Sequence, residues 1–137
     1  MSAKHKKHQH PTPNLWLAHA RSDLSLARIA MDHDVLPEQI CFHAQQAAEK
    51  AFKAVLLFAG VDFPYSHDLE ELLDTLEDAG IKVPEPLQDV GMLTPYAVET
   101  RYPGFGEDIN EQDISEAVTL AEKAIAWAEE HISSAKD

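Results

Sequence analysis

One stretch of this 137-residue chain organises the rest: FHAQQAAEKAFKAVLLFAG, residues 42–60. Its small and apolar residues recur at the spacing of one helix face, at Ala44, Ala47, Ala48, Ala51, Phe52 and Val55. Small side chains let a neighbouring helix approach closely, so we expect this segment to be the central helix of a bundle. It is predicted to run from about Pro37, which suits a first helical turn, to Ala59, with Gly60 as its stop.

Helical patterns continue on both sides of this segment. Residues 1–13 are polar and end in prolines, which predicts a tail, and a helix is expected from Asn14, a good N-cap, to Met31. Beyond Gly60 we predict three further helices, which begin or end at recognisable capping or stop residues. Their expected ranges are from His67–Asp68 to Gly80, from Pro86 to Thr100 with a bend near Thr94, and from Asn110 onward.

The overall pattern predicts one helical domain. No stretch alternates apolar and polar residues in the way of a strand. The expected class is therefore all-α, an antiparallel up-and-down four-helix bundle with an additional short helix. We expect the domain to occupy residues 14–133, with residues 134–137 as a C-terminal tail.

The acidity of the chain limits its partners. Eleven Lys and Arg stand against 24 Asp and Glu, which gives a net charge of −13 at pH 7 with histidine neutral. Such a chain repels polyanions at long range, and a general nucleic-acid coat protein needs a basic face. RNA is therefore not expected as a tight ligand. A local site for one nucleotide stays open, because a single Arg or Lys acts at short range.

Cysteine use and hydropathy point to the cytoplasm. The single cysteine, Cys41, excludes an intramolecular disulfide, and its apolar neighbours Ile40 and Phe42 predict a buried thiol. The longest apolar run, residues 54–59, is far short of the roughly 20 residues of a membrane span. We therefore expect a cytoplasmic location without membrane association.

A second, polar face of the central helix carries candidate site residues. Gln45, Glu49 and Lys53 follow one another at i, i+4 and i+8, and Glu49 before Lys53 is the favourable order for a helical ion pair. Spacing alone favours a solvated, salt-bridged face over a binding surface. His67, just before the next helix, could cap that helix, bond across to another one or contribute a site group.

The loop Thr100-Arg101-Tyr102-Pro103-Gly104 is the other candidate. An Arg beside a Tyr can present a guanidinium and a ring together, and Arg binds phosphate bidentately and stacks on bases. Arg101 could equally pair with one of the many acids. No Ser-His-Asp order, P-loop, HExxH or cysteine-rich zinc pattern occurs, so the residues predict no catalytic group, no cofactor and no metal site.

Three motifs, in this order, resemble those of one family. Residues 42–54, FHAQQAAEKAFKA, are similar to its QQAAEKAxKA signature, Ser66–Leu69 to its THDL element, and Arg101-Tyr102-Pro103 to its RYP element. Residues 20–27 also look like the family's first helix. On these motifs the chain resembles, over about residues 15–132, the small stand-alone form of the HEPN domain, the "higher eukaryotes and prokaryotes nucleotide-binding" domain.

The resemblance carries expectations about structure and partners. It implies a four-helix bundle with an extra short helix, commonly a homodimer, and a minimal nucleotidyltransferase as partner in a toxin–antitoxin-like pair. It also implies a nucleotide site in which Arg101 meets phosphate and Tyr102 stacks or hydrogen-bonds. The residues expected to line the neighbouring surface are Gln45, Glu49, Lys53 and His67.

One feature of the family is missing. Many HEPN relatives are metal-independent ribonucleases that carry a His a few positions after the Arg. Here no His follows Arg101 until His131, so the acid and base that such cleavage requires are not in place. The sequence therefore favours a binding role. A homodimeric ribonuclease and a non-catalytic protein-interaction module are the alternatives.

Overall fold

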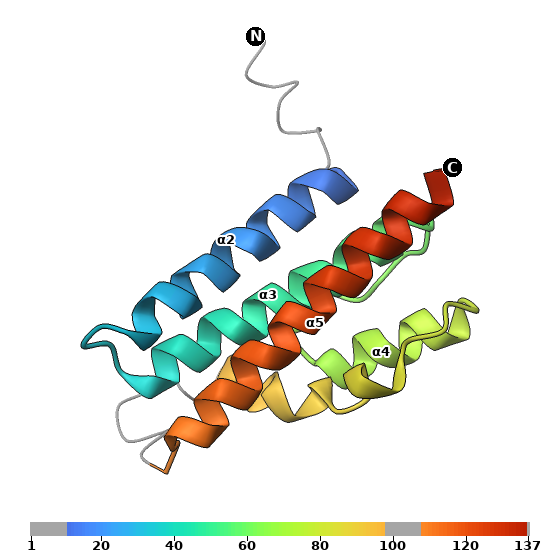
Figure 1. Ribbon diagram of the computed structural model, residues 1–137. Helices are drawn as coiled ribbons and strands as arrows, with labels where there is room; N and C mark the ends of the chain where they lie inside the picture. Colours follow the sequence, from blue (N-terminus) through green and yellow to red (C-terminus); the bar gives the residue numbers. More distant parts are fainter. Residues whose placement is uncertain (1–10, 98–107, 137) are drawn as a thin grey trace, which may run out of the picture.

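The computed structural model describes residues 11–97 and 108–136, and within these ranges every regular element is a helix (Figure 1). The predicted all-α class is confirmed. The α-helices are α2 (Pro13–Met31), α3 (Pro37–Phe58), α4 (Leu69–Asp78) and α5 (Glu111–Lys136). Two 3-10 helices, η1 (Glu85–Leu87) and η2 (Val90–Ala97), connect α4 with the last part of the chain.

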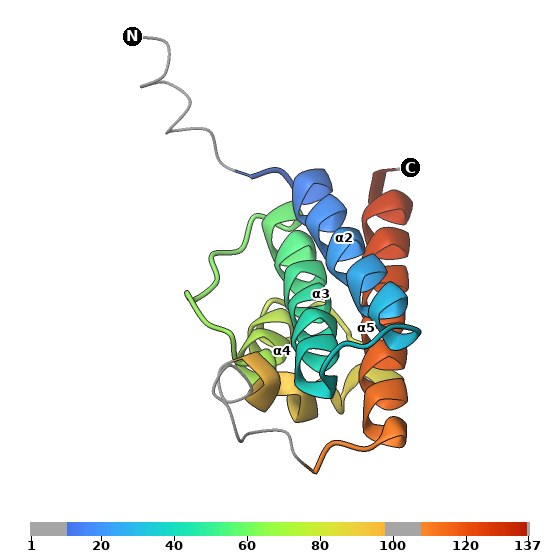
Figure 2. The ribbon, with the colours of Figure 1, turned by 90° about the vertical axis from the view of Figure 1, so that its left-hand side faces the viewer.

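Helix α3 is the centre of the bundle, as its alanine-rich face predicts. It packs against α2, α5, α4 and η2, and its Ala44, Ala47, Ala48 and Ala51 are completely buried. Figures 1 and 2 show that α2 runs antiparallel to α3, whereas α5 runs in the same direction as α3. An extended connection between α3 and α4 brings the chain back along α3, and this connection later forms part of the site.

Capping residues define the helix boundaries, and one predicted cap is wrong. Helix α2 begins one residue before Asn14, at Pro13, and Thr12 is its N-cap: the Thr12 hydroxyl accepts a hydrogen bond from the Leu15 N–H at 3.1 Å. Proline fits this first position because it has no N–H to satisfy. Asp68 caps α4 by accepting from the Glu70 and Glu71 N–H groups, as the acidic start of that helix suggests.

The remaining helix ends follow the sequence closely. After α3 and α4 the chain turns at Gly60 (φ 73°) and Gly80 (φ 81°), in the left-handed region that favours glycine. Asn110 caps α5, with its side-chain oxygen accepting from the Asp113 N–H at 2.8 Å. The Asp113 carboxylate in turn accepts from the Asn110 N–H at 3.1 Å, which makes a reciprocal capping pair.

The helix predicted over residues 86–100 is not an α-helix. The described part of this range forms the two short 3-10 helices, and Pro95 lies inside η2. Proline removes a backbone donor, and Gly91 adds backbone freedom, so tighter and shorter 3-10 turns replace a continuous helix. Leu87, Val90 and Leu93 still reach the core from these turns.

Candidate functional site

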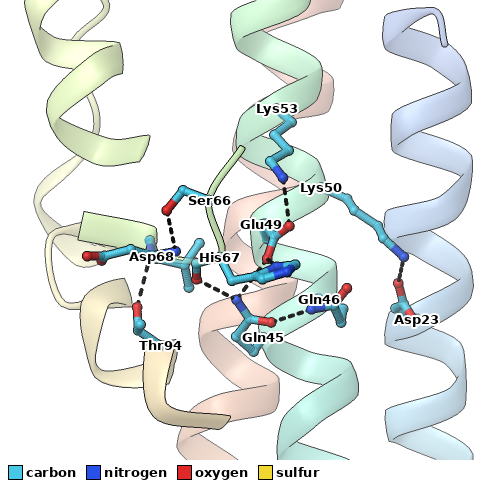
Figure 3. A network of polar contacts seen from close by, with 11 residues as sticks. Asp23, Gln45, Gln46, Glu49, Lys50, Lys53, Ser66, His67, Asp68 and Thr94 are labelled. Atoms are coloured by element: carbon cyan, nitrogen blue, oxygen red, sulfur yellow. Dashed lines mark hydrogen bonds and ion pairs between the residues drawn. The ribbon is translucent and has the colours of Figure 1, made fainter. Parts of the chain in front are cut away.

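The polar face of α3 is buried, which corrects the prediction of a solvated face. Gln45 is completely inaccessible, and the side chains of Glu49 and Lys53 are only 4% and 8% exposed. Figure 3 shows the cause: the connection that carries Ser66 and His67 passes beside this face of α3. A helical pattern cannot reveal that an irregular segment covers one of its polar faces.

These residues form one network centred on the Glu49 carboxylate (Figure 3). Lys53 Nζ bonds to Glu49 Oε2 at 2.8 Å. His67 Nδ1 donates to Glu49 Oε1 at 2.9 Å, and Gln45 Nε2 donates to the same oxygen at 3.0 Å. Gln45 Nε2 also donates to the His67 backbone carbonyl at 3.0 Å. Four of the six predicted site residues therefore come together.

The network keeps Glu49 ionised in spite of its burial. Burial by itself raises the pKa of this carboxyl, because it disfavours the charge. The hydrogen bonds from Lys53, His67 and Gln45, together with the Lys53 charge, outweigh burial and lower the pKa of Glu49 below its ordinary value. The ionised carboxylate in turn holds these three partners in place.

His67 is the member of the network that reaches the surface, with a side chain that is 54% exposed. Because the ionised Glu49 only accepts, Nδ1 of His67 carries the proton, and Nε2 is an acceptor in the neutral ring and a donor in the charged one. The backbone around His67 is also fixed. The Asp68 N–H donates to Ser66 Oγ at 2.9 Å, and the Leu69 N–H donates to Thr94 Oγ1 at 3.0 Å.

A second carboxylate–histidine pair lies on the α2 side of α3, and the sequence analysis missed it. Asp23 is nearly buried and accepts from His43 Nδ1 at 3.0 Å and from Lys50 Nζ at 2.6 Å. The sequence held one signal: Asp23 is the only acid of α2 and directly precedes Leu24 of its apolar stripe. A lone acid at the edge of a buried stripe needs a partner.

Two predicted site residues cannot be placed in this network. Arg101 and Tyr102 lie outside the described residues. Where the structure describes the chain, it contains no group of three His, Cys, Asp or Glu side chains that could hold a metal ion. None of the described helices is long and apolar enough to cross a membrane.

The structure defines the class of the protein: it is an α-helical bundle whose central helix carries a buried polar network. The family model of the HEPN domain matches residues 13–131. The chain belongs to the HEPN domain family.

Two solved structures are similar to this chain over nearly their whole length. One is ST0689, an archaeal HEPN homologue, with 26% identity and a TM-score of 0.74; the match covers 90% of this chain and 99% of that one. The other is TT1696 from Thermus thermophilus, with 32% identity and a TM-score of 0.73, covering 88% of this chain and 98% of that one. The comparison with curated proteins gives no match.

Proposed function

We propose that this HEPN domain binds a nucleotide at the surface around His67 and acts as the binding partner of a minimal nucleotidyltransferase. The observation that carries the proposal is the half-exposed imidazole of His67, held through Nδ1 by the buried Glu49. A fixed ring loses little side-chain freedom when a ligand binds. The network lies on the helix that carries the family's signature motif.

The residues have different roles in this site. His67 contacts a phosphate oxygen through Nε2, and Arg101 and Tyr102 supply the guanidinium and the ring that the family motif implies. Lys53 and Glu49 neutralise each other and are largely buried, so they position His67 and do not themselves contact the phosphate. Gln45 fixes the His67 backbone by donating to its carbonyl.

Calorimetric titration with ATP tests the nucleotide part of the proposal. The wild-type chain is compared with Arg101→Ala and His67→Ala, and with His33→Ala as the matched control, since His33 is also exposed but bonds to the Ile29 carbonyl at the end of α2. We expect weaker binding by the first two variants and unchanged binding by the control. Absence of heat with wild-type protein refutes the proposal, and equal binding by Arg101→Ala removes Arg101 from the site.

The partner part of the proposal rests on charge. The exposed side of α4 carries a dense acidic surface that a basic protein complements, formed by Glu70, Glu71, Asp74, Glu77 and Asp78. We expect the gene next to the one for this chain to encode a minimal nucleotidyltransferase, so that the two proteins form a toxin–antitoxin-like pair. Co-expression should give a complex that weakens with salt, and separate elution of the two proteins at low salt argues against the pair.

We also propose that two copies associate through the outer face of α2. Leu15, Leu26 and Ile29 are exposed there, and Asp23, the only acid of α2, is nearly buried and bonded to Lys50. Two chains of charge −13 need a contact that is apolar and free of acids. Leu26→Glu should convert a dimer to a monomer in light scattering; a wild-type monomer contradicts the association.

Metal-independent RNA cleavage is the second candidate function. The observation that favours it is that two histidines on different sides of α3, His43 and His67, are each oriented through Nδ1 by a carboxylate. This chemistry needs one acid and one base, so both imidazoles would have to reach the same RNA phosphate. Purified protein incubated with RNA and EDTA decides the question. Cleavage that is lost in His43→Ala and His67→Ala supports the second function, and intact RNA eliminates it.

A further inference from the structure

A groove lies beside the buried network, and Lys53 belongs to both. It has a volume of about 430 Å³ and lies between the beginning of α2, the later turns of α3 and the connection after α3. Its lining includes Trp16, Lys53, Asp62, Phe63 and Tyr65. This volume lies in the range of small-molecule sites, and the groove is distinct from the surface of His67 itself.

The floor of the groove combines a cation with two aromatic rings. Lys53 Nζ lies 5.7 Å from the centroid of Trp16 and 5.8 Å from that of Phe63. The two rings pack edge to face, with their centroids 6.3 Å apart. The ammonium also bonds to Glu49, so the groove and the network share one residue.

The rim of the groove is aromatic as well. Tyr65 is fully exposed, although it lies in a connection whose neighbours Phe63 and Pro64 are partly buried. Aromatic rings provide flat surfaces on which another ring can stack. Asp62 adds a carboxylate acceptor to a lining that is mainly apolar and aromatic and that also includes Lys53. Flat apolar walls with a few polar groups suit a planar heterocycle better than an aliphatic chain.

We propose that this groove binds the base of the nucleotide whose phosphates meet His67. The inference rests on the proposed function and adds the subsite that recognises the ring. Two observations indicate that a single ligand can occupy both the groove and the surface at His67. Tyr65 precedes His67 by two residues, and Lys53 and His67 bond to the same Glu49 carboxylate. The base lies against Phe63 and Tyr65, and Lys53 forms the polar end of the groove.

The experiment separates the ring from the phosphate. In a Trp127→Phe background, Trp16 is the only tryptophan, and its fluorescence reports on the groove. ATP is titrated first as the test of the proposed function, and AMP is then compared with ribose 5-phosphate, which lacks the base. Tyr65→Ala probes the rim without disturbing packing, because Tyr65 is fully exposed, and Met92→Ala is the control, an exposed apolar residue at another cavity.

We expect AMP to quench Trp16 and to bind at least five-fold more tightly than ribose 5-phosphate. Tyr65→Ala should weaken the binding of AMP at least three-fold and leave the affinity for ribose 5-phosphate unchanged. Met92→Ala should change neither affinity. ATP binding with equal affinities for AMP and ribose 5-phosphate overturns the inference and leaves the proposed function intact. Absence of ATP binding overturns both.

Discussion

Replacing Lys53 with Met tests how the buried network contributes to stability. Methionine has about the length of the lysine stem, so the packing between Trp16 and Phe63 is largely kept while the charge is removed. Glu49 then stays buried, with a side chain only 4% exposed, and loses its bond to Lys53 Nζ. The change therefore leaves a buried carboxylate without its cation.

The expected cost follows from that burial. Removing one partner of a buried ion pair typically costs about 3–5 kcal/mol. We expect the lower end, about 3 kcal/mol, because Glu49 still accepts hydrogen bonds from Gln45 and His67. The pair between Arg28 and Glu122 has similar geometry, with 2.7 Å between Nη2 and Oε2, but its side chains are 53% and 39% exposed. Arg28→Met should therefore cost less than about 1 kcal/mol.

Urea unfolding followed by circular dichroism measures both variants. With a slope of about 1.5 kcal/mol per molar urea, Lys53→Met should lower the midpoint by about 2 M. The double variant Glu49→Gln, Lys53→Met should regain part of the loss, because the uncompensated charge is gone. The reasoning is refuted if Lys53→Met and Arg28→Met lower the free energy of unfolding equally. It is also refuted if the double variant loses more free energy of unfolding than Glu49→Gln and Lys53→Met lose together.

Three further predictions concern groups on other parts of the fold. Burial raises the pKa of the Cys41 thiol to about 11, so at pH 8 a disulfide reagent should label it only after denaturation; rapid labelling of native protein contradicts this. The folded-state pKa of Glu49 lies below its ordinary 4.5, so its ionised form stabilises the fold above that pH and this stability is lost as the pH falls toward the lowered pKa. Unfolding free energies measured from pH 6 to pH 3 should therefore decrease less steeply for Glu49→Gln than for wild type, and parallel curves would disprove the linkage. Thr12→Ala removes the α2 cap and should cost about 1 kcal/mol in urea unfolding, whereas Asn14→Ala should cost less; the reverse order would place the cap at Asn14.

The helices of this bundle could be predicted because their signals are local. The alanine face of α3, the glycine stops and the Asn110 cap depend on residues within a few positions of one another. The segment 86–97 could not be predicted in detail, because the balance between an α-helix and 3-10 turns around Pro95 depends on tertiary contacts such as those of Leu87 and Leu93 with the core. The N-cap of α2 is two residues before the predicted one, because Thr12 and Asn14 are both good caps.

The sequence predicted which of the described polar residues lie together, Gln45, Glu49, Lys53 and His67, but it did not predict the burial of the three on α3. The spacing of Gln45, Glu49 and Lys53 placed them on one face, and the family motif added His67. Their burial depends on the connection after α3 and on Trp16 of α2, which the periodicity of α3 does not describe. The same limit hid Asp23 and its bonds to His43 and Lys50, since these contacts join two helices.

The most direct test of nucleotide binding at this site is a ¹H–¹⁵N correlation spectrum of the labelled chain, recorded during titration with ATP. The indole N–H of Trp16 and the backbone amides of Phe63, Tyr65 and His67 should shift together with one dissociation constant. The indole N–H signal of Trp127, a partly buried ring that packs against the core residue Phe52, should not shift. Shifts that gather instead around Met92 and Ser115, at the cavity beside α5, or an unchanged spectrum would contradict the site.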